Sequence, residues 1–170
     1  MNASDRRKEI LSVLQQSTGP VSATALAQQL GVSRQIIVGD VALLRAAGSE
    51  ICATPRGYVI VRATPGLTHR IACRHDSNGM ATELHTIVEL GCTVADVIVE
   101  HPIYGQITGP LQLSSHADVD QFIHRCHSES AQPLSLLTEG IHLHTICCPN
   151  EDAFTQVQKK LSELGILLSG

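Results

Sequence analysis

The stretch IHLHTICC, residues 141–148, places two histidines two positions apart in an apolar run rich in residues that favour β-structure. Side chains alternate between the two faces of a strand, so His142 and His144 point the same way. Two imidazoles side by side on one face form either a hydrated polar sheet surface or part of a metal site. The stretch therefore predicts a strand and leaves its chemistry to the rest of the chain.

The segments around this strand predict an α+β fold. Apolar spacing and turn residues indicate, in order, strand 69–75, helix 80–90, strands 94–101 and 103–113, helix 116–129, strand 141–148 and helix 151–164. Strands alternating with helices, with two consecutive strands in the middle, predict an open, mostly antiparallel sheet covered by helices on one face.

The N-terminal residues have a different pattern, typical of a winged helix-turn-helix. Helix 5–16 is followed by a short helix that Ser22 caps and Gly31 ends, and by a third helix that Ser33 caps. The turn LGVS joins the last two helices, as in a helix-turn-helix. Two β-rich runs then flank the turn Thr54-Pro55-Arg56-Gly57, which predicts a wing.

Charge separates the chain into two expected domains, 1–64 and 65–170, joined by the turn-like Thr64-Pro65-Gly66. The first contains seven Lys or Arg and four Asp or Glu, a net charge of +3, whereas the second has a net charge of −7. A basic head on an acidic body indicates that the head binds a polyanion. Only four residues are aromatic, which disfavours base stacking on single strands and favours double-stranded DNA as the partner.

The third helix supplies the residues expected to contact DNA. In a winged helix-turn-helix this helix enters the major groove with its first turn leading, and Arg and Gln recognise guanine and adenine edges. We expect the DNA-binding residues to be Ser33, Arg34, Gln35, Arg45 and, at the wing, Arg56, with the Arg6–Lys8 cluster as further backbone contacts. A winged helix that binds another protein instead remains the alternative.

Six cysteines are spread over the predicted elements without a CxxC pair. This pattern is typical of small buried side chains in a reducing compartment and does not indicate disulfides or a thiolate zinc site. The chain has no apolar run of about 18–20 residues and no secretory signal, so we expect a cytoplasmic protein with no membrane partner.

Two further residues can join the paired histidines of strand 141–148. His75 ends the strand 69–75, and Glu83 lies one turn into the next helix. Three imidazoles and a carboxylate suit a divalent transition metal such as Zn, Ni, Fe or Mn, provided the fold brings them together. The pair His124 and His127 favours a solvated helix face, and His85 is expected to point away from Glu83. The role of His101 stays open.

The whole set of motifs resembles a known family. The segments VSRQIIVGDVALLRAAG, ATPRGY, RHD, VEHPIYGQITGPL and IHLHTI occur in the order found in nicotinate-responsive repressors of NAD metabolism (NiaR/YrxA-like), which join a winged helix to a three-histidine (3H) domain. The resemblance implies a homodimer that binds operator DNA, with nicotinic acid as co-repressor, and that controls genes of NAD biosynthesis or nicotinate uptake. It also implies that residues 65–170 form the sensing and dimerisation domain, with a divalent metal held by His75, Glu83, His142 and His144.

The sequence departs from the family pattern at Gly39 and Ser49-Glu50, which leaves the operator sequence open. Two other functions also remain: a regulator that senses the metal itself, and a metal-dependent enzyme carrying a DNA-binding domain. No spare carboxylate–histidine pair stands out as a general base, so the expectation is a protein that is not an enzyme.

Overall fold

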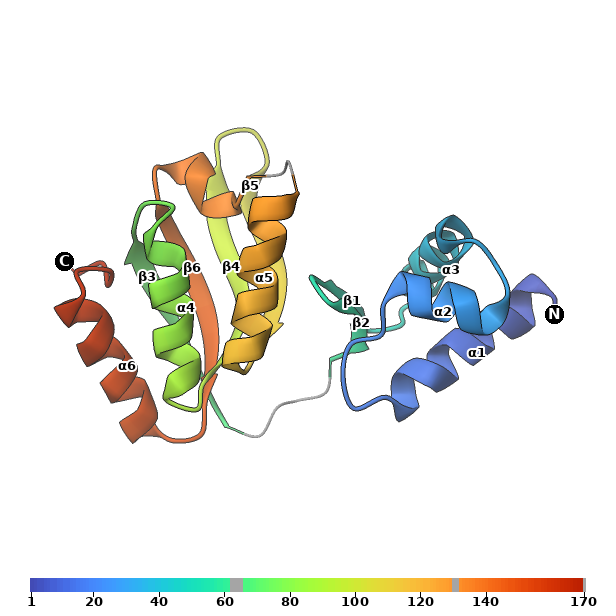
Figure 1. The fold of residues 1–170 in the computed structure, drawn as a ribbon. Coiled ribbons are helices and arrows are strands. Elements are labelled where there is room, and N and C mark those ends of the chain that lie inside the picture. Colours follow the sequence, from blue (N-terminus) through green and yellow to red (C-terminus); the bar gives the residue numbers. More distant parts are fainter. Residues whose placement is uncertain (62–65, 130–131, 170) are drawn as a thin grey trace. The chain divides into compact units, whose positions relative to one another are not determined.

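A computed structural model describes residues 1–61, 66–129 and 132–169 (Figure 1). The chain divides into two compact units, Met1–Ala63 and Thr64–Gly170, each with its own hydrophobic core. The turn expected at Thr64-Pro65-Gly66 lies mostly outside the described residues, since only Gly66 is among them.

The first unit begins with three helices, α1 (Ala3–Gln16), α2 (Ala23–Leu30) and α3 (Arg34–Ala46). Asn2, Ser22 and Ser33 each precede a helix, and each side chain accepts a hydrogen bond from the backbone amide three residues later. Gly31 ends α2 in the left-handed conformation with φ of 65°. The sharp exit from α2 and the cap on α3 produce the helix-turn-helix that the sequence predicts.

The wing is the hairpin of β1 (Ile51–Thr54) and β2 (Gly57–Ile60). Val21, which precedes α2, pairs with Tyr58 through two backbone hydrogen bonds of 2.9 and 2.8 Å. Gly57 has a φ of 137°, and a Cβ there would overlap the backbone of Val21, so the close pairing requires glycine. The wing is thereby joined to the helical part of the unit.

A buried carboxylate connects α1 to α3 inside this unit. Asp40 is only 4% exposed, and Arg6 Nε lies 2.6 Å from one of its oxygens while an Arg7 guanidinium nitrogen lies 3.4 Å from the other. The sequence had suggested the Arg6–Lys8 cluster as a DNA backbone contact. In the fold, Arg6 and Arg7 instead neutralise the buried charge of Asp40. Lys8 is the exposed member of the cluster.

The second unit is one four-stranded sheet with helices on one face (Figure 1). The strands follow the order β3-β6-β4-β5, and every neighbouring pair is antiparallel. Its elements are β3 (Leu67–Arg74), α4 (Gly79–Glu89), β4 (Thr93–His101), β5 (Gly105–Leu113), α5 (His116–Ser128), the 3-10 helix η1 (Leu134–Thr138), β6 (Ile141–Cys148) and α6 (Glu151–Glu163). This architecture confirms the predicted α+β fold.

Strand β6 lies in the interior of the sheet between β3 and β4. Its burial alternates, because His142 and His144 are buried towards the helices whereas Ile141 and Leu143 are exposed on the other face. Opposite His144, β4 contains a β-bulge: Val94 pairs with Ile146 but Ile98 pairs with Leu143. The sequence could not predict this bulge.

Several boundaries differ from the prediction for local reasons. The 3-10 helix η1 was not expected, and strand β5 starts at Gly105 rather than at residue 103. There the amides of Ile103 and Tyr104 donate to His101 Nδ1, which turns the chain between β4 and β5. After α6 the backbone pairs with the edge strand β3 through an isolated bridge between Leu167 and Cys73.

All six cysteines are free, as their scattered positions indicated, although the buried thiols of Cys92 and Cys148 lie 2.9 Å apart. Within the described residues, no helix is both long and apolar enough to cross a membrane.

Replacing Asp40 with Ala should destabilise the first unit, because the substitution leaves the largely buried Arg6 guanidinium without its carboxylate. We expect the free energy of unfolding to fall by about 2–3 kcal/mol. Urea denaturation of the full chain, followed by NMR amide signals of residues in α1 and α3, measures it. The control Asp5→Ala removes an exposed acid from α1 and should cost less than about 1 kcal/mol. Equal losses in the two variants would contradict the role given to Asp40.

Candidate metal centre

Three imidazoles surround one buried carboxylate on the helix-covered face of the sheet. Glu83 on α4 is 0% exposed. His75 Nε2 lies 2.5 Å from its Oε2, His142 Nε2 lies 3.1 Å from both oxygens, and His144 Nε2 contacts Oε1. The fold therefore brings together the four residues grouped from the sequence: His142 and His144 on β6, Glu83 on α4, and His75 directly after β3.

The other nitrogen of each ring has the same kind of partner. His75, His142 and His144 direct Nδ1 at the backbone carbonyl oxygens of Asp76, Gly140 and Asp96, at 2.5, 2.8 and 2.7 Å. A carbonyl oxygen only accepts, so Nδ1 carries the hydrogen in all three rings. When the imidazoles are neutral, every Nε2 is then unprotonated and directs its lone pair at Glu83.

Lone pairs converging on a carboxylate repel one another unless positive charge lies between them. Protonating all three rings provides it, but then the buried site holds two more positive charges than negative ones, which is costly. A divalent cation bound by three neutral imidazoles and one carboxylate leaves a smaller net charge and uses all four donors. Backbone carbonyls on the outer nitrogens of metal-binding histidines are the usual arrangement.

The pKa values follow from the same contacts when protons supply the charge. Burial lowers the pKa of His75 and of His144, but the hydrogen bond to Glu83 and its negative charge outweigh burial, so both pKa values are raised. Burial raises the pKa of Glu83, but the three imidazoles outweigh it and hold that pKa well below its usual range. His75 and His144 therefore hold a proton more readily than a free imidazole does, so protons compete with a cation at these two rings.

Backbone geometry fixes His75 at the end of β3. A Cβ at Gly79, the first residue of α4, would come within 2.5 Å of His75 Cβ. On the other side, Gly140 has a φ of 88° and a Cβ there would overlap the His75 carbonyl oxygen. Asp76 completes the turn, because its carboxylate accepts hydrogen bonds from the amides of Asn78 and Gly79. Two glycines therefore bring α4 and β6 close enough for one centre.

The bulge in β4 positions His144. It directs the backbone oxygen of Asp96 at His144 Nδ1, and the Asp96 carboxylate accepts from the amide of Thr145 at 2.8 Å. A regular ladder would use this carbonyl for pairing with β6. The irregularity thus supplies an acceptor for an imidazole instead.

Cys73 is a neighbour of the centre that the sequence analysis missed. Its Sγ, a Glu83 oxygen and a His142 nitrogen all lie within 4.8 Å of one another. Burial and then the charge of Glu83 raise the pKa of this thiol, which keeps it protonated. The available signal was its position: Cys73 lies on β3 two residues before His75, which directly follows the strand, and Cys73 pairs with His142 across the sheet.

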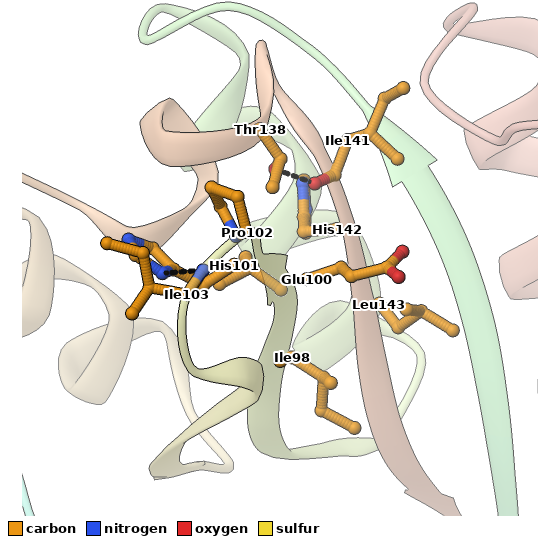
Figure 2. Close-up of a pocket in the computed structure, with 11 residues that line it drawn as sticks. Ile98, Glu100, His101, Pro102, Ile103, Thr138, Ile141, His142 and Leu143 are labelled. Carbon is orange, nitrogen blue, oxygen red and sulfur yellow. Dashed lines mark hydrogen bonds between the residues drawn. The ribbon is translucent and has the colours of Figure 1, made fainter.

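A pocket of about 730 Å³ lies where β4 ends and β6 begins, and Figure 2 shows its lining. Its residues come from β4, the turn after it, the start of β5, η1 and β6: Ile98, Val99, Glu100, His101, Pro102, Ile103, Gly105, Thr138, Ile141, His142 and Leu143. His142 therefore belongs both to the pocket lining and to the cluster around Glu83. None of the lining residues is Lys or Arg.

The residues expected to contact DNA all lie in the first unit. Ser33, Arg34 and Gln35 are exposed at the start of α3, and Arg45 is exposed in its last turn. Arg56 lies in the turn between β1 and β2 and is partly buried. In the second unit, His124 and His127 are exposed on α5, as expected.

The metal-free protein should lose stability as the pH rises above neutrality. His75 and His144 have raised pKa values in the folded state, so their contribution is fully present below the unfolded pKa of 6.5 and is lost as pH rises through the folded pKa values. Thermal unfolding in EDTA between about pH 6.5 and pH 9 measures this decline.

In the control Glu83→Gln the carboxylate that raises both pKa values is absent, and the decline should disappear. The lowered pKa of Glu83 itself contributes stability that is fully present above pH 4.5, the ordinary pKa of a glutamate. That contribution is lost only as the pH falls through the pKa of Glu83 in the folded state, outside the pH range of this test. A parent protein whose melting temperature rises steadily from neutral to alkaline pH in EDTA would contradict this assignment.

Comparison with known proteins agrees with this two-part architecture. A model described as an HTH domain matches residues 6–59, and a model described as a 3H domain matches residues 68–170. The probable transcription repressor NiaR of Thermotoga maritima is 40% identical over 164 residues, covering 96% of this chain and 94% of that protein. The transcription repressor NadR of Bacillus subtilis is 40% identical over 168 residues, covering 96% of this chain and 93% of that protein.

These relatives are named as transcription repressors and align with nearly the whole of this chain, which makes it a regulator with a helix-turn-helix domain and not an enzyme. The chain belongs to the 3H-domain family of transcription repressors.

Proposed function

We propose that this protein is a nicotinate-responsive repressor that binds operator DNA as a homodimer and controls genes of NAD biosynthesis or nicotinate uptake. The first unit binds double-stranded DNA. The second unit holds a divalent metal through His75, Glu83, His142 and His144, senses nicotinic acid and forms the dimer. The observation that carries the sensing part is the convergence of three Nε2 atoms on Glu83.

The donor set supports a transition metal. Three imidazole nitrogens and a carboxylate suit Zn, Ni, Fe or Mn, with expected ligand distances of about 2.0–2.2 Å. The hydrogen bonds at the three Nδ1 atoms hold the rings in the required tautomer before any ion arrives. Four protein ligands leave a position for a small ligand on a metal that prefers five or six.

Nicotinic acid fits the charge of such a centre. The pocket that includes His142 is lined mainly by apolar residues, and its one acidic residue, Glu100, disfavours an anion. A carboxylate entering this region needs a positive partner that the lining does not supply. The ion would supply it, at an open position for the carboxylate or ring nitrogen of the ligand.

The exposed start of α3 supports sequence-specific DNA binding. Arg34 and Gln35 are exposed in its first turn, the part of a recognition helix that contacts base edges. One such unit contacts few base pairs, so specificity favours a dimer with half-sites about 34 Å apart or a multiple of that distance. The open face of the sheet, where Ile141 and Leu143 are exposed, is our candidate dimer interface.

Replacing His142 with Ala should remove the metal and the response to nicotinate. The first unit should stay folded and bind DNA weakly. Elemental analysis and titration of labelled operator DNA with and without nicotinate measure both effects, with the exposed His127→Ala on α5 as a control that keeps them. Full nicotinate response in metal-free His142→Ala would contradict the metal-held ligand. A response of the parent to metal alone, unchanged by nicotinate, would instead establish a direct metal sensor.

Replacing Arg34 with Ala should weaken specific operator binding by about 1–3 kcal/mol and relax the base preference at one position of each half-site. The matched control Lys8→Ala removes the same charge from an exposed site on α1 and should weaken binding evenly across sequences. Competition assays with a set of single-base operator variants at fixed salt measure both. If Arg34→Ala leaves the order of preference among these variants unchanged, the recognition role is wrong.

A further inference from the structure

Two histidines and an aspartate, side chains of types that can bind metals, meet between α4 and α5, the adjacent helices on the covered face of the sheet (Figure 1). His85 Nδ1 lies 2.6 Å from His116 Nδ1, and His85 Nε2 lies 2.9 Å from an Asp120 carboxylate oxygen. The two rings stack with centroids 4.8 Å apart and an interplanar angle of 22°. From the sequence we expected only that His85 points away from Glu83.

This group is separate from the centre around Glu83. Two residues along an α-helix correspond to a rotation of about 200°, so Glu83 and His85 lie on nearly opposite sides of α4. Glu83 is fully buried, whereas the His85 side chain is 30% exposed and that of Asp120 is 73% exposed. An ion here would be reached directly from water and would share no ligand with the buried centre.

The contacts settle where the hydrogen of His85 lies. A carboxylate only accepts, so the neutral His85 ring donates Nε2–H to Asp120 and keeps its lone pair at Nδ1. That lone pair faces Nδ1 of His116. A carboxylate behind a histidine is the common arrangement that orients a metal ligand and increases its basicity.

We propose that Nδ1 of His85 and Nδ1 of His116 chelate a second divalent transition-metal ion of the zinc, nickel and copper class, with Asp120 as the orienting residue. These metals prefer imidazole nitrogen, and water completes the coordination. Nitrogen atoms about 2.0–2.1 Å from a tetrahedral ion lie roughly 3.3 Å apart, so the rings must separate slightly from their present contact. Both side chains lie at the surface, where this movement is easy, and His116 moves its own hydrogen to Nε2.

The alternative is a plain hydrogen bond in which His116 Nδ1–H donates to His85. That pair would bind no ion and would need nothing from Asp120 beyond fixing the ring. Metal stoichiometry therefore separates the two. The measurement is equilibrium dialysis of the full chain against Zn²⁺, with the bound zinc counted by elemental analysis.

The parent should bind two zinc ions per chain, one tightly and one more weakly. His116→Ala should lose the weaker ion and keep the tight one, and His142→Ala should lose the tight ion and keep the weaker one. His127→Ala, which removes another exposed imidazole of α5, should match the parent. The two single losses are independent, so failure of the buried centre leaves the test of this outer site intact.

Asp120→Asn tests the orienting role, because the amide keeps the size of the side chain but loses the charge. This substitution should lower the affinity for the second zinc ion by about 10–100-fold. Circular dichroism in EDTA checks that all variants are folded. The proposal is overturned if parent and His116→Ala bind equal zinc at every concentration, or if His127→Ala loses as much as His116→Ala. Unchanged affinity in Asp120→Asn overturns the role of Asp120.

Discussion

A carboxylate with no access to water governs the organisation of the second unit. Glu83 is ionised and fully buried, and an isolated buried charge would cost many kilocalories per mole. Three imidazoles supply the compensation, His142 and His144 on β6 and His75 directly after the adjacent β3, and each is held by a backbone carbonyl oxygen. The bulge in β4, the glycines beside His75 and the interior position of β6 are the backbone features that this arrangement requires.

The first unit also contains a buried carboxylate whose charge is neutralised by neighbouring side chains. Asp40 lies on the buried side of α3, and Arg6 and Arg7 of α1 neutralise it. This pair fixes the helix that presents Arg34 and Gln35 against the helix that begins the chain. In one unit the compensating charges are permanent guanidinium groups. In the other they are imidazoles, whose charge depends on protons or a bound ion. That difference suits a fixed scaffold in the first unit and the sensing role that we propose for the second.

Local patterns sufficed for most of the fold. The strand at residues 141–148 was predicted to the residue from alternation, and Ser22, Gly31 and Ser33 marked the helix-turn-helix because caps and left-handed turns depend on single residues. The four residues of the proposed centre were grouped from their residue types and positions, but spacing alone related only His142 to His144, and the complete ligand set was what the resemblance implied. The rest depends on tertiary pairing. The bulge at Asp96, the proximity of Cys73 to Glu83 and the contact of His85 with His116 arise between segments far apart in the chain.

The interior position of β6 also limits how the chain can vary between relatives. One face of this strand carries His142 and His144, and the opposite face carries the exposed Ile141 and Leu143. Losing or gaining one residue here would exchange the faces, turning imidazoles to water and isoleucine towards the carboxylate. In β4 an extra residue is already absorbed by the bulge. Insertions and deletions among homologues should therefore occur at the bulge in β4 and be rare in β6, even where the amino acids of both strands diverge.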